Sequence, residues 1–306
     1  MTTGTVLKRR GPEWLVAGFV SFAIYLVLRY TLDGSVILAD FLIVTPSVGL
    51  AIPLGVLLGY PAAVGLLCGA LAVALAHSVL SFWTLFEALS LFVLALVSSL
   101  AWGVHVGPDE RAVGGLAAWL SFASLTLVVS TGAAAFLGWA GELLGLFPFY
   151  VTFPETLLRY VLATAVVAPP LVIAATRTRT WAPHERMPNT EPSTPSKRNR
   201  WGFVLVPLVW ALLAVTGSIG FSIRERFDRT TLQDLGFEFL YHWVHPDVFG
   251  QGGRRVQVVF GALMFTAWLA TLTATRARTT TAGNDAANPA QENPSTHGEE
   301  PGGVVR

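Results

Sequence analysis

The stretch TFPETLLRYVLATAVVAPP, residues 152–170, is apolar enough to enter a membrane, yet it carries Glu155 and Arg159 near its start. A helix that crosses a hydrocarbon core about 30 Å thick needs about 20 mainly apolar residues. The two charged residues are four apart with the acid first, which is the favoured order for an ion pair within a helix. The stretch therefore predicts a transmembrane helix with a charge pair near one end.

The composition of the whole chain is typical of a membrane protein. Hydrophobic residues make up 53% and charged residues 13%, whereas soluble domains have about 45–50% and about 25%. The mean hydropathy is +0.58. With a net charge of +1, the composition does not support nucleic-acid binding, and the single cysteine excludes an intramolecular disulfide.

Eight segments are apolar over the length of a membrane span and around their whole circumference, unlike the amphipathic helices of soluble proteins. They predict an all-α fold, a polytopic transmembrane helix bundle of about eight spans arranged as six plus two. The expected spans are residues 14–30, 41–58, 61–80, 85–104, 112–139, 155–175, 201–221 and 256–275.

Polar segments divide the chain into four expected parts. The charged and aromatic stretch within the second unit is expected to form an interfacial segment on the outer side, and the C-terminal tail lacks apolar residues to bury. The parts are a six-span bundle (1–176), a basic Pro/Ser/Thr-rich cytoplasmic linker (177–200), a two-span unit (201–278) with the interfacial segment at 222–253, and a disordered polar tail (279–306).

Arginine and lysine predict the orientation, because they collect on the cytoplasmic side of membrane proteins. Lys8, Arg9 and Arg10 precede the first span, and more basic residues follow the sixth in 177–200. Six crossings place both groups on the same side. The sequence thus predicts a multi-pass protein of the cell membrane, embedded in the lipid bilayer, with both termini cytoplasmic.

Four polar residues near the outer surface are candidate ligand-binding groups. His77 and Glu87 lie where the third span ends and the fourth begins. They either sit in hydrated headgroups or bind a proton, a cation or a polar ligand. If Pro154 starts the sixth helix, Glu155 lies in its first turn. Arg159 and Glu155 then either anchor the boundary or face the bundle, where Arg159 would hold an anionic group.

Small residues and prolines mark the second and third spans. Two pairs have the GxxxG spacing that lets helices in lipid approach closely, Gly55 with Gly59 and Gly65 with Gly69. Pro46 and Pro53 each lack a backbone donor and are expected to break or kink the helix beside a cavity.

Catalytic signatures are absent from the sequence, which contains no G-x-S-x-G, HExxH, Walker A or dinucleotide fingerprint. This argues against an enzyme without excluding one. His242 and His245 have helical spacing, but a zinc site needs a third ligand. We expect no metal and no cofactor.

The six-span block, about residues 14–176, resembles the substrate-binding S components of energy-coupling factor transporters. The resemblance rests on TPSVGLAIPLGVLLGYPAAVGLLCG, on an outward Glu87, and on FYVTFPETLLRYVLATAV opening the last helix. It implies an outward cavity bounded by spans two, three and six and partners among ATPase and scaffold transport subunits. The pair of spans after the linker departs from the S-component core.

The pattern PSVGLAIPLGVLLG is also similar to the membrane sensory domains of the MASE1 type, which precede signalling domains. Two hypotheses follow. In the first, the protein is a small-molecule-binding transport subunit whose cavity is lined by Arg159, Glu155, Glu87 and His77. In the second, it is a membrane sensor or scaffold without transport, which acts through signalling proteins bound by its basic linker and tail.

Overall fold

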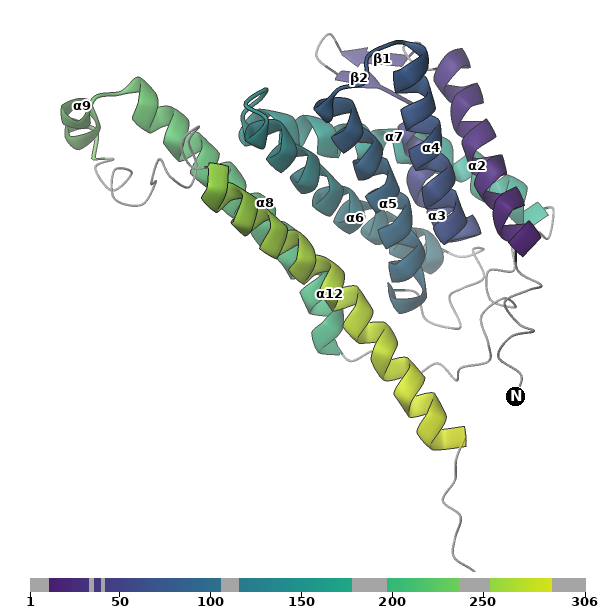
Figure 1. Cartoon of the computed structure of the whole chain (residues 1–306). Helices are drawn as coiled ribbons and strands as arrows, with labels where there is room; N and C mark the ends of the chain where they lie inside the picture. Colours follow the sequence, from purple (N-terminus) through teal and green to yellow (C-terminus); the bar gives the residue numbers. More distant parts are fainter. Residues whose placement is uncertain are drawn as a thin grey trace, which may run out of the picture.

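The structure is a computed structural model that describes residues 11–32, 36–39, 42–105, 116–177, 197–236 and 254–287. These residues form a helical bundle with one short two-stranded sheet (Figure 1). The elements are α2 (Gly11–Thr31), β1 (Val36–Ala39), β2 (Leu42–Val44), the 3-10 turn η1 (Val48–Leu50), α3 (Ala51–Leu58), α4 (Tyr60–Ala76), α5 (Phe82–His105), α6 (Leu116–Leu143), α7 (Phe149–Arg177), α8 (Lys197–Arg226), α9 (Arg229–Asp234) and α12 (Arg254–Ala287).

Within the described ranges, five helices are long and apolar enough to cross a membrane, which is compatible with an integral membrane protein. Large apolar side chains such as Leu15 and Phe19 are exposed on α2, as expected for a surface that contacts lipid. Three further expected spans correspond to shorter apolar helices, Val48–Leu58, Tyr60–Ala76 and Val256–Leu272. The candidate spans are Pro12–Thr31, Phe82–Trp102, Ala118–Leu143, Phe149–Ala174 and Trp201–Arg226.

Residues 41–58 were expected to form one membrane-spanning helix, and this prediction was wrong. The first part of this segment is strand β2, which pairs antiparallel with β1 in the register Val36↔Val44 and Ile37↔Ile43. Such β-branched residues favour a strand, and Pro46 disfavours a helical Thr45. The helix therefore begins only after this turn, where the amide of Val48 donates to the carbonyl of Thr45 at 3.0 Å.

The short helix α3 nevertheless brings the chain back to the level at which α2 began. The ring of Tyr60, just after α3, lies 5.4 Å from the ring of Trp14 near the start of α2. At the other end of the same helix pair, Tyr30 and His77 lie 5.9 Å apart. Because the starts meet and the ends meet, α2 and α4 run parallel, and α3 is the return crossing between them.

Glycines set the close contacts of this first half. A Cβ added at Gly65 would lie 2.2 Å from the carbonyl oxygen of Gly18, and one at Gly69 would lie 2.7 Å from the ring of Tyr25. These two positions therefore pack α4 on α2, as their spacing predicted. Gly59 differs, because its φ of 75° lets it separate α3 from α4.

The centre of the bundle is α5, which contacts α3, α4 and α6, while α7 covers α6 and η1. The β-hairpin lies at the end of the bundle opposite to the start of α2 (Figure 1). Large buried side chains fill the interior between these helices, including Leu50, Ile52, Leu66, Leu94, Val97 and Leu125.

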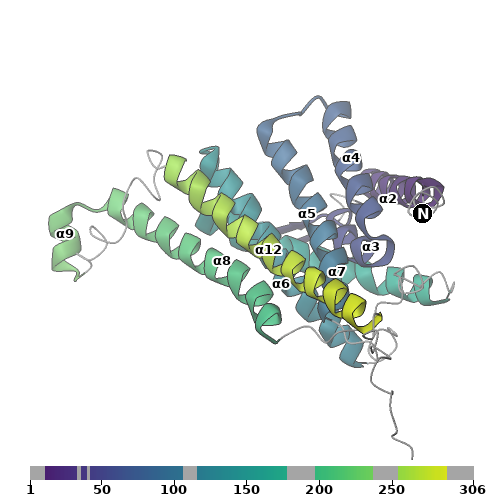
Figure 2. The same ribbon diagram turned by 60° about the horizontal axis from the view of Figure 1, so that its bottom comes forward.

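The C-terminal helices α8 and α12 lie side by side and pack against α6 (Figures 1 and 2). Helix α12 runs to Ala287, beyond the boundary at residue 278 that the tail composition suggested. Extending an existing helix adds one hydrogen bond per residue without a new nucleation cost. The polar composition of residues 279–287 therefore does not prevent a helical backbone.

Several sequence-based predictions fall on residues outside the described ranges. These include Lys8, Arg9 and Arg10, the linker residues 178–196, the aromatic part of the interfacial segment at 237–253 with His242 and His245, and the tail after 287. The orientation of the chain and its division into four parts therefore remain predictions.

Candidate functional site

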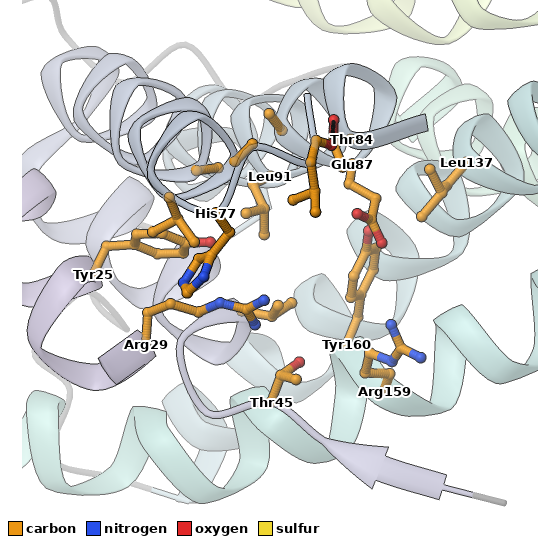
Figure 3. A pocket seen from close by; sticks show the side chains of 16 residues that line it. Tyr25, Arg29, Thr45, His77, Thr84, Glu87, Leu91, Leu137, Arg159 and Tyr160 are labelled. Atoms are coloured by element: carbon orange, nitrogen blue, oxygen red, sulfur yellow. Dashed lines mark hydrogen bonds between the residues drawn. The ribbon is translucent and has the colours of Figure 1, made fainter. Parts of the chain in front are cut away.

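A cavity of about 710 Å³ lies at the end of the bundle where α2 and α4 end and α5 begins. Its walls come from α2, the turn after β2, α4, α5, α6 and α7, so no short stretch of sequence contains the site. Figure 3 shows the side chains that surround it. The polar lining residues are Tyr25, Arg29, Thr45, His77, Thr84, Glu87, Arg159 and Tyr160.

Three of the four predicted site residues line this cavity. His77 ends α4, Glu87 lies in the second turn of α5, and Arg159 comes from α7. His77 is exposed, whereas Glu87 and Arg159 are half-buried. The fourth residue, Glu155, does not line the cavity.

Glu155 instead binds Arg159 from the more exposed side of the pair. The Nη2 of Arg159 donates to Oε1 of Glu155 at 2.6 Å, so the ion pair predicted from their spacing is present. Glu155 is the more exposed partner, at 44% against 29% for Arg159. The Nε of Arg159 is buried and has no hydrogen-bond partner within the described ranges. The guanidinium of Arg159 is therefore bound to Glu155 through Nη2, while its Nε remains available as a donor.

The expected helix start at Pro154 was wrong. Helix α7 begins at Phe149, and the carbonyl of Pro148 accepts from the amides of Val151 at 3.1 Å and Thr152 at 3.2 Å. Phe149 is buried and stacks on Phe153 with ring centroids 5.5 Å apart, which favours the earlier start. Glu155 consequently lies past the first turn, where the helix dipole acts weakly.

Sequence reasoning missed several residues of the cavity wall. Arg29 was not among the predicted site residues, although it follows Tyr25 by four residues on the same helical face. This four-residue spacing was the sequence feature that could have predicted both Tyr25 and Arg29 as neighbours in one site. Thr45 reaches the cavity because the chain is not helical before Pro46. Tyr160 had no signal beyond its position next to Arg159.

A buried hydrogen bond connects α5 to α7 beside the site. The hydroxyls of Ser90 and Tyr160 lie 2.6 Å apart, and Ser90 Oγ also donates to the carbonyl of Glu87 at 2.8 Å. Since Ser90 has one proton and it goes to this carbonyl, Tyr160 is the donor to Ser90. The bond fixes the helical turn that carries Glu87 against the one that carries Arg159.

Glu87 is a carboxylate with cations nearby but without a direct ion pair. The guanidiniums of Arg159 and Arg29 line the same cavity and act on it electrostatically, and the side chain of Trp83 hydrogen-bonds to it. No cation within the described ranges comes within ion-pair distance of its oxygens. Charged groups in partly apolar surroundings require compensation from a partner. Glu87 thus faces the cavity with acceptor capacity left over.

A second, much smaller cavity of about 30 Å³ lies between the bundle and the C-terminal helices. Ser218 donates to a carboxylate oxygen of Glu142 at 3.2 Å, and Trp139 donates from Nε1 to the carbonyl of Gln257 at 2.8 Å. These bonds connect α6 to α8 and α12. The space has room for about one water molecule, so we assign it a structural role.

Groups of three or more histidine, cysteine or acidic side chains placed to hold a metal are absent from the part of the chain that the structure describes. Comparisons of the chain with protein-family models, curated proteins and solved structures find no match. The resemblances to S components and to MASE1-type domains therefore remain predictions. Function is inferred from the site alone.

Proposed function

We propose that the protein is a multi-pass protein of the cell membrane that binds a small molecule in the cavity between α2, α4, α5 and α7, as the substrate-binding subunit of a transporter. The observation that supports this proposal is the meeting of Arg159, Glu87 and His77 in one cavity. These residues come from three different helices. Polar groups inside an apolar bundle are costly, and they typically mark a ligand or ion pathway.

The size and lining of the cavity also support a small-molecule ligand. Its volume of about 710 Å³ lies within the range of about 300–1,000 Å³ that is usual for ligand pockets. Apolar side chains supply part of the wall, including Val48, Val73, Leu91 and Leu137. A few polar groups on an apolar wall are the usual arrangement of a binding site.

The proposed orientation places the cavity on the outer side of the membrane. It lies at the end where α2 finishes, and basic residues at the N-terminus predict that α2 starts in the cytoplasm. A cavity open to the outside suits the capture of a solute before transport. The transport step would then require ATPase or scaffold partners.

Binding is tested by exposing purified protein in detergent to a small-molecule extract. The immobilised protein is washed and denatured, and the released molecules are identified by mass spectrometry. Wild type is compared with a cavity variant, Arg159→Ala with Glu87→Ala, and with a control variant, Glu225→Ala with Arg226→Ala. The control residues are exposed on α8, and the control variant removes the same two charge types outside the cavity.

We expect a small molecule that is enriched on wild type and on the control but lost from the cavity variant. Gel filtration and thermal unfolding establish that all three proteins are folded. If folded wild type, control and cavity variants release the same molecules in the same amounts, the cavity is not the binding site and the proposal fails.

The sensor hypothesis rests on the basic residues of 177–200. It predicts that replacing these arginines and lysines abolishes the capture of a signalling protein, and that the cavity variant changes no uptake. The transport hypothesis predicts that the cavity variant abolishes uptake, whereas the linker variant retains it. Measuring uptake and partner capture with both sets of variants therefore separates the two functions.

A further inference from the structure

Resting on the proposed function, we infer that the ligand is a small amphoteric molecule. Its oxyanion, such as a carboxylate, binds between Arg29 and Arg159, and its ammonium or other positively charged N–H group faces Glu87. The inference follows from the separation of donor and acceptor groups on the cavity wall (Figure 3).

The oxyanion end is defined by two guanidiniums and a hydroxyl. Arg29 and Arg159 reach the cavity from opposite walls, with Thr45 between them (Figure 3). Thr45 Oγ1 and Arg159 Nε are buried and have no hydrogen-bond partner within the described ranges. Guanidinium groups bind carboxylate and phosphate through parallel N–H donors. An oxyanion here would satisfy both orphaned atoms.

The cationic end is defined by Glu87. Its carboxylate lies on the α5 wall beside Tyr160, away from Thr45 (Figure 3). Arg159 and Arg29 act on it only at longer range. A ligand ammonium or ring N–H beside these oxygens would supply the missing charge-assisted hydrogen bond. A purely anionic ligand would leave this carboxylate with only the Trp83 hydrogen bond and the two guanidiniums beyond ion-pair distance.

The apolar side chains of the cavity wall select the body of the ligand. Leu91, Val73 and Leu137 contribute apolar wall, and the volume of about 710 Å³ exceeds what one inorganic ion fills. A compact ring or short chain that separates the two charged ends suits this space. A ligand bearing only positive charge is disfavoured by the two arginines.

Three matched probes test the inference by calorimetry or ligand-observed NMR with the full chain in detergent at neutral pH. Para-aminomethylbenzoate carries both charges, para-methylbenzoate only the anion, and para-methylbenzylamine only the cation. We expect the amphoteric probe to bind about tenfold or more tightly than the anion, because a charge-assisted hydrogen bond has about this value. The cationic probe is expected to bind weakest.

Variants assign each end of the probe to its residues. Glu87→Gln is expected to remove the advantage of the amphoteric probe over the anion, and Arg159→Gln or Arg29→Gln to weaken both probes about tenfold. Arg159→Lys, which keeps the charge, covers the case in which a glutamine variant fails to fold. The matched controls Glu225→Gln and Arg226→Gln are expected to leave all affinities unchanged.

The inference is overturned if the cation binds as well as the amphoteric probe, if Glu87→Gln leaves the ratio unchanged, or if no probe binds. None of these results contradicts the proposed function. The proposed function is tested separately, by whether wild type captures a molecule from the extract that the cavity variant does not capture.

Discussion

Trp268 of α12 packs directly on Gly132 of α6, where any added Cβ would lie 2.2 Å from the indole ring. The relationship is reciprocal, since a Cβ at Gly261 of α12 would lie 2.2 Å from Trp139 of α6. Glycine and tryptophan are seven residues apart on each helix, so they share one face. The two helices therefore run antiparallel, each placing a large side chain where the other has none.

Replacing Gly132 is expected to loosen the attachment of the C-terminal helices. Gly132→Val would overfill the site of Trp268 and lower the free energy of unfolding by about 1–3 kcal/mol, measured by thermal and chemical unfolding in detergent. Ala262→Leu is the control, because it adds as many carbon atoms at an exposed position of α12. Equal losses for the two variants would show that the tryptophan contact does not hold the helices together.

The Arg159–Glu155 pair is expected to contribute little to stability. Both partners are partly exposed, at 29% and 44%, and exposed pairs contribute about 0–1 kcal/mol. Glu155→Gln should therefore shift unfolding by less than about 1 kcal/mol and reduce its dependence on salt. A much larger loss in chemical denaturation would mean that Glu155 determines the position of Arg159 in the cavity wall.

The Ser90–Tyr160 hydrogen bond is expected to matter more, because both residues are buried. Ser90→Ala leaves the Tyr160 hydroxyl without its acceptor and should lower the free energy of unfolding by about 1–3 kcal/mol. The double variant with Tyr160→Phe should lose less than the sum of the single variants. Ser124→Ala, at an exposed position, is the control. Additive losses in this cycle would contradict a direct bond.

Asp228, outside the membrane-spanning helices, is expected to make α9 sensitive to acid. Its side chain accepts from the hydroxyls of Thr230 and Thr231 and caps the helix through the amide of Thr231. These bonds hold the pKa of Asp228 below its usual range. The cap is therefore complete at pH values above the usual pKa of a carboxyl group. It is lost as the pH falls through the lowered pKa of Asp228.

Hydrogen exchange of residues 229–234 measures this acid sensitivity. Protection should fall on acidification in wild type and be independent of pH in Asp228→Asn, which retains a capping side chain without the ionisation. The same loss of protection in the asparagine variant would assign the effect to another group.

The helical segments were predictable because their cause is local. A run of apolar residues around the whole circumference indicates a membrane helix wherever it occurs, and Trp201–Arg226 is an example. The pair Glu155–Arg159 was equally predictable, since both charges lie on one helix. Residues 41–58 were misjudged because the same apolar residues also suit a buried strand, and the turn at Pro46 decided between the two.

The sequence alone determined the membrane-type composition, most of the helices and three of the residues that line the cavity. The tertiary structure decided that Arg159 lines the cavity and that Arg29, Thr45 and Tyr160 join it. It also decided that Trp268 meets Gly132. Hydropathy acts on each segment independently, whereas a cavity or a close helix contact exists only when residues far apart in the chain are packed together.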